Sequence, residues 1–357
     1  MGYDIALIPG DGIGREVVPT AVPLLKEVAL KHNFRIEWTN YDWGAQRYFD
    51  EGRMLPEDGL DDLAAHDAIL LGAAGHPDIP DHLTLRELML PIRKRFDQGV
   101  CKRPTILFNG VESPLRGYEG GEIEFVVFRE NTEGEYADIG GREHQGQSNE
   151  VAIQSAVYTR SSTETIVRAA FEAADERGGT LTNVTKSNAQ AYGMVFWDDI
   201  VAEVAQDYPR VEVERLLVDA ASMDLIRRPH EFNVIVASNL FGDILTDIGG
   251  AISGSLGLAP SANINPTGEY PSMFEPVHGS APDIAGRSIA NPLATVLSGA
   301  MLFSHVGEEA AATTVRNLVA DQLADGSAPR TPDLGGENGT LDVVADLRER
   351  LKNGTLD

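Results

Sequence analysis

Short apolar runs alternate with longer amphipathic segments over most of the chain. Residues 5–8, 68–71 and 234–237 are continuous aliphatic runs, which are typical of strands buried on both faces of a sheet. Further strands are expected at 35–39, 123–128, 151–158, 181–185 and 211–218. Helical periodicity predicts helices at 16–32, 56–65, 84–97, 162–177, 193–205, 292–305, 308–323 and 341–351. This alternation predicts an α/β fold with a largely parallel sheet.

Three segments interrupt the pattern. Residues 9–14, P-G-D-G-I-G, predict a tight loop, but the glycines do not have the G-x-G-x-x-G spacing of a Rossmann dinucleotide site. Residues 138–149 predict an exposed loop or arm, and residues 275–286 are too rich in glycine and proline for a regular element. Pro91 is expected to kink or break the helix at 84–97.

Composition narrows the function classes. The 357 residues carry 55 acidic and 29 basic side chains, a formal charge of -26, which argues against nucleic-acid binding and against docking on an anionic membrane. The chain has one cysteine, Cys101, and shows no signal peptide and no apolar run of membrane-spanning length. A chain of roughly two domains in the reducing cytoplasm is the expectation.

The candidate metal site is the stretch 238–247, S-N-L-F-G-D-I-L-T-D, which follows a buried strand. Gly242 is expected to break the chain before a helix, in whose first turn Asp243 and Asp247 lie four residues apart and so share one face. Two carboxylates this close repel unless one is protonated or a cation lies between them, and Mg²⁺ or Mn²⁺ suits oxygen ligands. The alternative is a solvated aspartate pair on an acidic surface.

A basic face is the second candidate feature. On an unbroken helix Arg86 and Arg93 share one side, roughly 10 Å apart by the helical rise, with Met89 and Leu90 between them. Arg103 follows nearby. Because arginine pairs bidentately with carboxylates, such a cluster suits a small acid with several carboxylates. The alternative is a solvated basic surface.

Several motifs together resemble a known family. They are L-I-P-G-D-G-I-G at 7–14, R-E-N-T-E-G-E-Y at 129–136, N-L-F-G-D-I-L-T-D at 239–247, and the loop at 278–286. In these the chain is similar, nearly end to end, to the β-decarboxylating dehydrogenases of the isocitrate and 3-isopropylmalate dehydrogenase family. The resemblance implies two α/β domains on a large, shared mixed sheet, not a Rossmann fold. It implies a cofactor-binding domain from 1–98 plus 254–357, and a substrate and dimerisation domain at 99–253 with an exposed arm at about 138–158.

The resemblance also implies roles for matching residues. Asp243 and Asp247, with Asp219 from a partner subunit, would hold Mg²⁺ or Mn²⁺. Tyr136 and Lys186 would be the acid–base pair, Lys186 again from the partner of a homodimer. The substrate carboxylates would be held by Arg93, Arg103 and Arg129. Further candidate substrate contacts, beyond those the resemblance gives, are Arg86, Met89, Leu90 and Asn188. NAD contacts would come from Glu275, His278, Gly279, Ser280, Ala281, Asp283, Ile284 and Asn291, with Asp283 and Ile284 at the adenosine ribose.

The substrate is expected to be a malate-type 2-hydroxy acid. Segments at 81–85, 96–98, 185–188 and 260–266 most resemble the tartrate and D-malate dehydrogenase branch. Two departures are Arg86, where that branch usually has tryptophan, and Cys101, where it has asparagine. Arg86 is hypothesised to favour a polar or anionic group on C3. Open alternatives are a 3-isopropylmalate dehydrogenase with Met89 and Leu90 lining an apolar pocket, an isocitrate or homoisocitrate enzyme, and a non-catalytic regulatory homologue.

Overall fold

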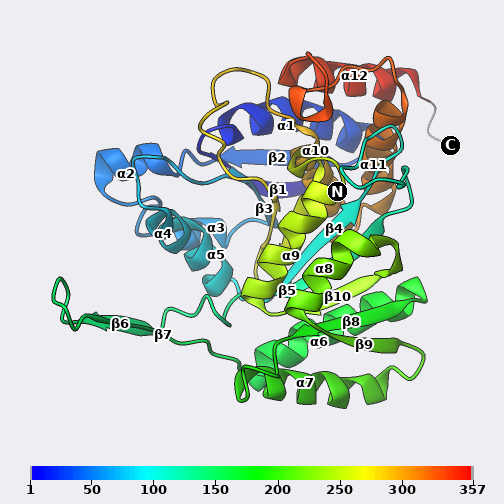
Figure 1. The fold of residues 1–357 in the computed structure, drawn as a ribbon. Coiled ribbons are helices and arrows are strands. Elements are labelled where there is room, and N and C mark those ends of the chain that lie inside the picture. Colours follow the sequence, from blue (N-terminus) through cyan, green and yellow to red (C-terminus); the bar gives the residue numbers. More distant parts are fainter. Residues whose placement is uncertain (1, 355–357) are drawn as a thin grey trace.

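A computed structural model describes residues 2–354, and its main feature is one large mixed sheet (Figure 1). The strands are β1 (Gly2–Gly10), β2 (Arg35–Asn40), β3 (Ala68–Ala73), β4 (Val100–Ile106), β5 (Glu124–Glu130), β6 (Gly140–Glu143), β7 (Val151–Gln154), β8 (Thr180–Thr185), β9 (Glu212–Leu217), β10 (Val234–Ala237), β11 (Pro260–Ile264) and β12 (Ser272–Pro276). Within the described residues ten of these strands form the sheet, in the order β2-β1-β3-β12-β11-β4-β5-β10-β8-β9. Strand β4 pairs antiparallel with β5 and β11, and β11 pairs antiparallel with β12. The mixed α/β fold class is confirmed.

Helices cover both faces of the sheet. They are α1 (Gly14–Lys31), α2 (Ala45–Glu51), α3 (Gly59–Leu63), α4 (Asp81–Thr84), α5 (Leu90–Arg95), α6 (Arg160–Arg177), α7 (Gly193–Val204), α8 (Val218–Arg227), α9 (Asn239–Ile252), α10 (Leu293–His305), α11 (Glu309–Ala324) and α12 (Thr340–Asn353). Helices α1, α10, α11 and α12 pack together at one end of the molecule, while α9 packs on β4 and β5 (Figure 1). The C-terminal helices therefore complete the layer that begins with α1.

The apolar runs that predicted strands are buried on both sides. In β1, Ile5 and Leu7 belong to the large core that contains α1, whereas Ala6 and Ile8 belong to a second core beneath α3 and α5. Alternate side chains of a strand point to opposite faces, so an uninterrupted apolar run fills both cores.

Helix α9 begins earlier than the sequence pattern predicted. Its N-cap is Ser238, so Gly242 lies inside the helix and Asp243 lies beyond the first turn. The prediction that Gly242 breaks the chain was wrong. A Cβ on residue 242 would lie 2.7 Å from the Cβ of Arg129, so glycine lets α9 approach β5 closely.

The helix expected at 84–97 is irregular. The helical run continues from 81 to 95, but the residues Leu85–Met89 form a π-helical turn between α4 and α5, and Pro91 lies just after it. The irregularity expected near Pro91 is thus a π-helical turn rather than a break. The inserted turn also changes the register between Arg86 and Arg93, so they do not share the face that an unbroken α-helix would give them.

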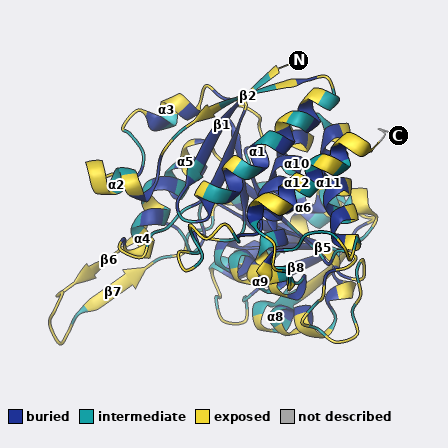
Figure 2. Cartoon of the chain, turned by 90° about the horizontal axis from the view of Figure 1, so that it is seen from above, coloured by how far each residue is buried: buried dark blue, intermediate teal, exposed yellow. Residues whose placement is uncertain are grey.

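Strands β6 and β7 form a two-stranded ribbon that projects from the molecule (Figure 1). Every residue of both strands is exposed (Figure 2). The expected arm is thus a hairpin at 140–154, shorter at its C-terminal end than the strand predicted at 151–158. Among the described residues, no helix is both long and apolar enough to cross a bilayer.

Candidate active site

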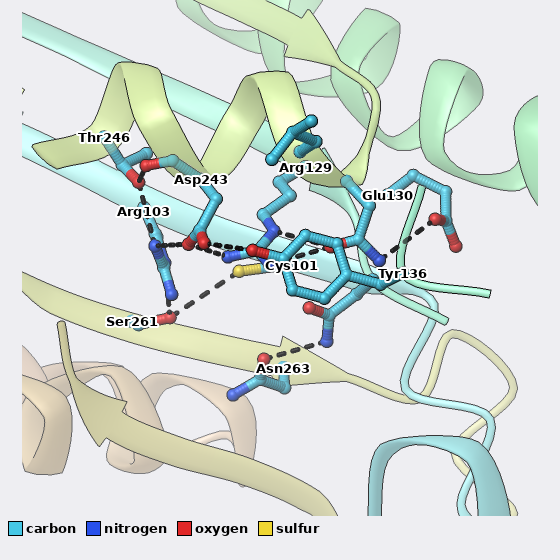
Figure 3. Close-up of polar contacts among 12 residues, drawn as sticks. Cys101, Arg103, Arg129, Glu130, Tyr136, Asp243, Thr246, Ser261 and Asn263 are labelled. Carbon is cyan, nitrogen blue, oxygen red and sulfur yellow. Dashed lines mark hydrogen bonds and ion pairs between the residues drawn. The ribbon is translucent and has the colours of Figure 1, made fainter. Parts of the chain in front are cut away.

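The Asp243 carboxylate lies at the centre of a cluster of cationic and polar side chains (Figure 3). Its Oδ1 accepts hydrogen bonds from Arg129 and, at 3.1 Å, from Arg103, and its Oδ2 accepts one from the Tyr136 hydroxyl at 2.7 Å. These partners come from β4, β5 and the loop after β5, while Asp243 comes from α9. Two neighbouring strands and one helix therefore bring four of the predicted site residues together.

The cluster controls the ionisation of Asp243. Burial alone would raise the pKa of this carboxyl, but the charges of Arg129 and Arg103 and the Tyr136 hydrogen bond lower it to about 2. The carboxylate is therefore ionised at neutral pH and available to a cation.

Tyr136 is held in its protonated form. Burial, then the charge and hydrogen bond of Asp243, raise the pKa of its phenol to about 12. The Arg129 guanidinium lies 5.3 Å from the centre of the Tyr136 ring, which fixes the ring over the cluster. A protonated phenol fits the role of general acid.

Arg93 is buried against a carboxylate. Its Nη2 donates to Oε1 of Glu275 at 2.8 Å, and side-chain exposure is 2% for Arg93 and 3% for Glu275. Asn263 Nδ2 donates to the same oxygen at 2.9 Å, and Asn131 Nδ2 donates to Asn263 Oδ1 at 2.8 Å. The structure thus places Glu275, expected at the cofactor, as the counterion of a predicted substrate arginine.

The charged side chains described above and Tyr136 line a cavity of about 200 Å³. Its polar wall consists of Arg93, Arg103, Arg129, Tyr136, Asp243 and Glu275, and its opposite wall includes Leu85, Met89, His278 and Gly279. The cavity therefore lies between the arginine cluster and the start of the predicted cofactor loop.

The remaining residues of the predicted basic face lie elsewhere. Arg86 is 44% exposed and pairs with Asp138 at the base of the ribbon, and Leu90 is buried without lining the cavity. The π-helical turn instead presents Leu85 and Met89 to the cavity. Arg86 therefore has no contact with the cavity within this chain.

Lys186, Asp219 and Asn188 lie apart from the Asp243 cluster. Lys186 donates to the Asp219 carboxylate, and this hydrogen bond lowers the pKa of Asp219. Asp219 lies in the first turn of α8 rather than at the end of a strand, and Asn188 is exposed. No contact within residues 2–354 joins these three side chains to Asp243.

Asp247 is the second carboxylate that α9 presents. Burial and the nearby Asp243 charge raise the pKa of Asp247, as expected for carboxylates one helical turn apart. The described part of the chain contains no cluster of three acidic, histidine or cysteine ligands. One chain therefore supplies two carboxylates whose oxygens suit a divalent ion, and a complete metal site needs further ligands.

The predicted cofactor loop packs on the glycine loop before α1. The Ser280 carbonyl accepts from Ile13 N at 2.9 Å, and a Cβ on Gly12, whose φ is +51°, would lie 2.0 Å from that oxygen. The Glu16 carboxylate accepts hydrogen bonds from Gly286 N and, at 2.9 Å, from Ser288 N. Glu16 thus fixes the far end of the loop, a role that its sequence position did not reveal.

Along this loop the predicted contacts have different environments. His278 Nε2 is buried with no hydrogen-bond partner among the described residues, which leaves it available to a ligand. Asp283 is exposed, Ile284 is half-buried, and Ala281 has a left-handed backbone with φ +40°. Asn291 is already engaged, since its Nδ2 donates to Asp333 Oδ2 at 2.9 Å.

Sequence reasoning missed three further members of the cluster. Asn239 Oδ1 accepts from Arg129 Nε and Nη2 at 3.1 and 2.7 Å. Thr246 Oγ1 accepts from Arg103 Nη1 at 2.8 Å, and Ser261 Oγ accepts from Arg103 Nε at 3.2 Å. The signal for Asn239 and Thr246 was their place in the same motif as Asp243. The signal for Ser261 was its place in the segment 260–266, which resembles the tartrate and D-malate dehydrogenase branch.

Known proteins share this architecture across the whole chain. The family model described as isocitrate/isopropylmalate dehydrogenase matches residues 4–347. The crystal structure of isocitrate dehydrogenase from Methylococcus capsulatus superposes with a TM-score of 0.88 at 34% identity, covering 98% of this chain and 99% of that one.

Curated relatives are similar over nearly their full length. A probable tartrate dehydrogenase/decarboxylase of Bacillus subtilis is 44% identical over 98% of both chains. The D-malate dehydrogenase [decarboxylating] of Escherichia coli is 45% identical over 96% of both, and the 3-isopropylmalate dehydrogenase of Thermobifida fusca is 44% identical over 97% of both.

The family match and these relatives show that the chain is a decarboxylating dehydrogenase, an oxidoreductase of a family that acts on small hydroxy acids. The chain belongs to the isocitrate/isopropylmalate dehydrogenase family. The predicted family and enzyme class are confirmed.

Proposed function

We propose that this enzyme catalyses the NAD-dependent and divalent-metal-dependent oxidative decarboxylation of a malate-type 2-hydroxy acid, D-malate or tartrate. The observation that carries the proposal is the clustering of Arg93, Arg103, Arg129, Tyr136 and Asp243 around one small cavity. Three arginines suit an acid with two carboxylates, and about 45% identity to tartrate and D-malate enzymes supports that choice.

Mg²⁺ or Mn²⁺ would be held by Asp243 and Asp247, with the partner subunit's Asp219 as a third carboxylate. Bound there, the ion would supply Lewis acidity to the hydroxyl and carboxylate oxygens of the substrate. In this structure Arg103 and Arg129 neutralise Asp243. When substrate binds, these arginines would turn to its carboxylates and leave the Asp243 oxygens for the ion.

The chain's own residues then have separate tasks. Arg93, Arg103 and Arg129 hold the two carboxylates and so fix the carbon that is oxidised. The partner subunit's Lys186 accepts the hydroxyl proton as the hydride leaves. After loss of CO₂, Tyr136 donates its proton to the carbon that carried the carboxylate, a step for which a protonated phenol is required.

NAD would lie along residues 278–291 and supply the hydride acceptor. The unpartnered His278 Nε2 and the cavity-lining Gly279 suit close contact with a ligand. The exposed Asp283 carboxylate suits the two hydroxyls of an adenosine ribose and would repel a 2′-phosphate. Turnover with NADP equal to that with NAD would remove this role of Asp283.

The enzyme would act as a homodimer with shared active sites. Helices α8 and α9 expose Met223 (50%), Ile226 (47%) and Ile244 (49%), and the β6–β7 ribbon carries Ile139 and Ile153 more than half exposed. Exposed apolar groups of this kind mark protein interfaces. Because Lys186 and Asp219 lie apart from Asp243 in one chain, the site is completed only if a second chain brings its own pair to it.

Substrate choice is tested by comparing kcat/KM for D-malate, tartrate and 3-isopropylmalate with NAD and Mn²⁺. The proposal predicts preference for D-malate or tartrate. The apolar Leu85 and Met89 in the cavity wall favour the second candidate, 3-isopropylmalate. A strong preference for that acid would replace the proposed substrate without changing the reaction.

Arg86 is tested in the same panel. Arg86 would affect substrate choice indirectly, through its ion pair with Asp138 at the base of the ribbon, or directly, if its side chain turned toward the cavity. The substrate ratios of Arg86→Trp are expected to move toward the apolar acid, with Asp138→Asn as the control for loss of the ion pair alone. Unchanged ratios in Arg86→Trp would remove Arg86 from substrate selection.

A further inference from the structure

A second cavity lies on the face of the sheet opposite the active site. Its volume is about 400 Å³, and it is bounded by β4 and β5, by α6, and by α10 and α11. Successive residues of β4 point to opposite faces, so Arg103 contacts α9 while Lys102, Pro104 and Ile106 line this cavity.

Lys102 is the cation of this cavity that touches no carboxylate. No carboxylate lies within 4.0 Å of its Nζ, and its Nζ has no hydrogen-bond acceptor, among residues 2–354. The Nζ lies 6.0 Å from the centre of the Phe128 ring, its nearest cation–π contact. A partly buried ammonium without a counterion is costly, so a ligand that supplies a negative charge would be stabilised there.

The other charged groups around the cavity are largely paired. Arg177 Nη2 pairs with Glu124 at 3.1 Å, and Arg316 pairs with Glu309. Burial lowers the pKa of His305, which favours its neutral form. Glu176 is the remaining acid, and its charge raises the pKa of Lys102 against the larger lowering caused by burial.

The remaining wall is apolar. Ile106, Val126, Ile264, Phe274 and Met301 line it. An ammonium that touches no carboxylate, beside an apolar wall, suits a ligand with one negative charge and a short hydrocarbon body, rather than phosphate or a dicarboxylate.

We propose that this cavity binds a small monocarboxylate, whose carboxylate pairs with Lys102 and whose carbon chain lies against the apolar wall. The site is separate from the substrate cavity but adjoins it through β4, because Lys102 and Arg103 are consecutive residues on opposite faces.

The test uses butyrate, which has one carboxylate, a short chain and no 2-hydroxyl. Calorimetric titration of the purified full-length protein is expected to show butyrate binding that weakens about tenfold or more in Lys102→Met, the effect of losing a charged hydrogen bond. Lys26→Met, which removes an exposed lysine from α1, is the matched control and is expected to bind as the unmodified protein does.

Two further measurements make the test independent of how well Lys102→Met folds. Glu176→Gln removes the opposing charge and is expected to tighten butyrate binding, while butyramide and inorganic phosphate are expected to bind far more weakly than butyrate. Equal butyrate affinity in Lys102→Met and the unmodified protein, or equal affinity for butyrate and butyramide, would overturn the proposal. Because binding is measured without substrate or NAD, its failure leaves the proposed reaction untouched.

Discussion

At the scale of single residues, the site is built from groups whose ionisation is set by their neighbours. Asp243 stays ionised because the two arginines and the Tyr136 hydrogen bond outweigh its burial, and Tyr136 stays protonated because burial, and then that same carboxylate, raise its pKa. One buried carboxylate thus prepares both a cation ligand and a proton donor.

Replacing Tyr136 by phenylalanine tests the proton-donor role. We expect kcat to fall by about 10² to 10⁴ while the substrate KM changes little, because general acid catalysis is lost and the arginines remain. Retention of full kcat in Tyr136→Phe would exclude Tyr136 as the proton donor.

A substitution at Glu275 tests whether this residue supports binding of the substrate or of the cofactor. Glu275→Gln leaves Arg93 buried without its counterion, so we expect lower stability by about 3–5 kcal/mol and a higher KM for the hydroxy acid. Thermal unfolding and steady-state kinetics measure both effects, with Asp283→Asn as the cofactor-side control. A KM change confined to NAD in Glu275→Gln would restore the cofactor role that the sequence suggested.

At the scale of elements, the sequence predicted the strands with continuous apolar runs and missed two strands that contribute polar side chains to the site. Strands β1, β3 and β10 are continuous apolar runs and were predicted. Strands β4 and β11 were missed because buried polar residues such as Arg103, Ser261 and Asn263 interrupt their pattern. The buried polar residues of β4 and β11 thus disrupt the apolar pattern by which these two strands would have been predicted.

Gly242 offers a test at this scale. In an ordinary helix interior, alanine in place of glycine would stabilise, but here its Cβ meets the Arg129 side chain. We expect Gly242→Ala to destabilise the protein by about 1–3 kcal/mol through overpacking and to raise the substrate KM by displacing Arg129. Gly326→Ala is the control, because this exposed glycine has no left-handed backbone and its Cβ would meet nothing within 4 Å. An unchanged substrate KM in Gly242→Ala would show that substrate binding does not depend on the close approach of α9 to β5.

At the scale of the whole molecule, the two ends of the chain meet in one sheet, since β11 and β12 lie between β3 and β4. Through the family resemblance, the sequence predicted roles for three aspartates and one lysine, and these roles stay predictions. It also implied that Lys186 and Asp219 act from a partner subunit, but it could not show that the two side chains pair with each other within one chain. The proposed division into domains at 98 and 254 stays a prediction.

Mixing two inactive variants tests the shared site. Tyr136→Phe and Lys186→Met each disable every site of their own homodimer. A mixed dimer has one site with both residues intact, so refolding the two together should restore up to about a quarter of the original activity if chains pair at random. Mixing either variant with itself is the control. No recovery in a verified mixed dimer would place Lys186 and Tyr136 in the same chain's site.

The account depends most on Asp243 and Asp247 acting with a divalent ion to drive both oxidation and decarboxylation. The direct measurement is the yield of labelled CO₂ and of NADH from carboxyl-labelled D-malate, with Mn²⁺, with a chelator, and in Asp243→Asn and Asp247→Asn. We predict CO₂ and NADH in equal amounts with Mn²⁺, and neither product after chelation or in the two variants. If CO₂ and NADH still formed in equal amounts with the chelator present and in both variants, the proposed role of the ion and the two aspartates would be contradicted.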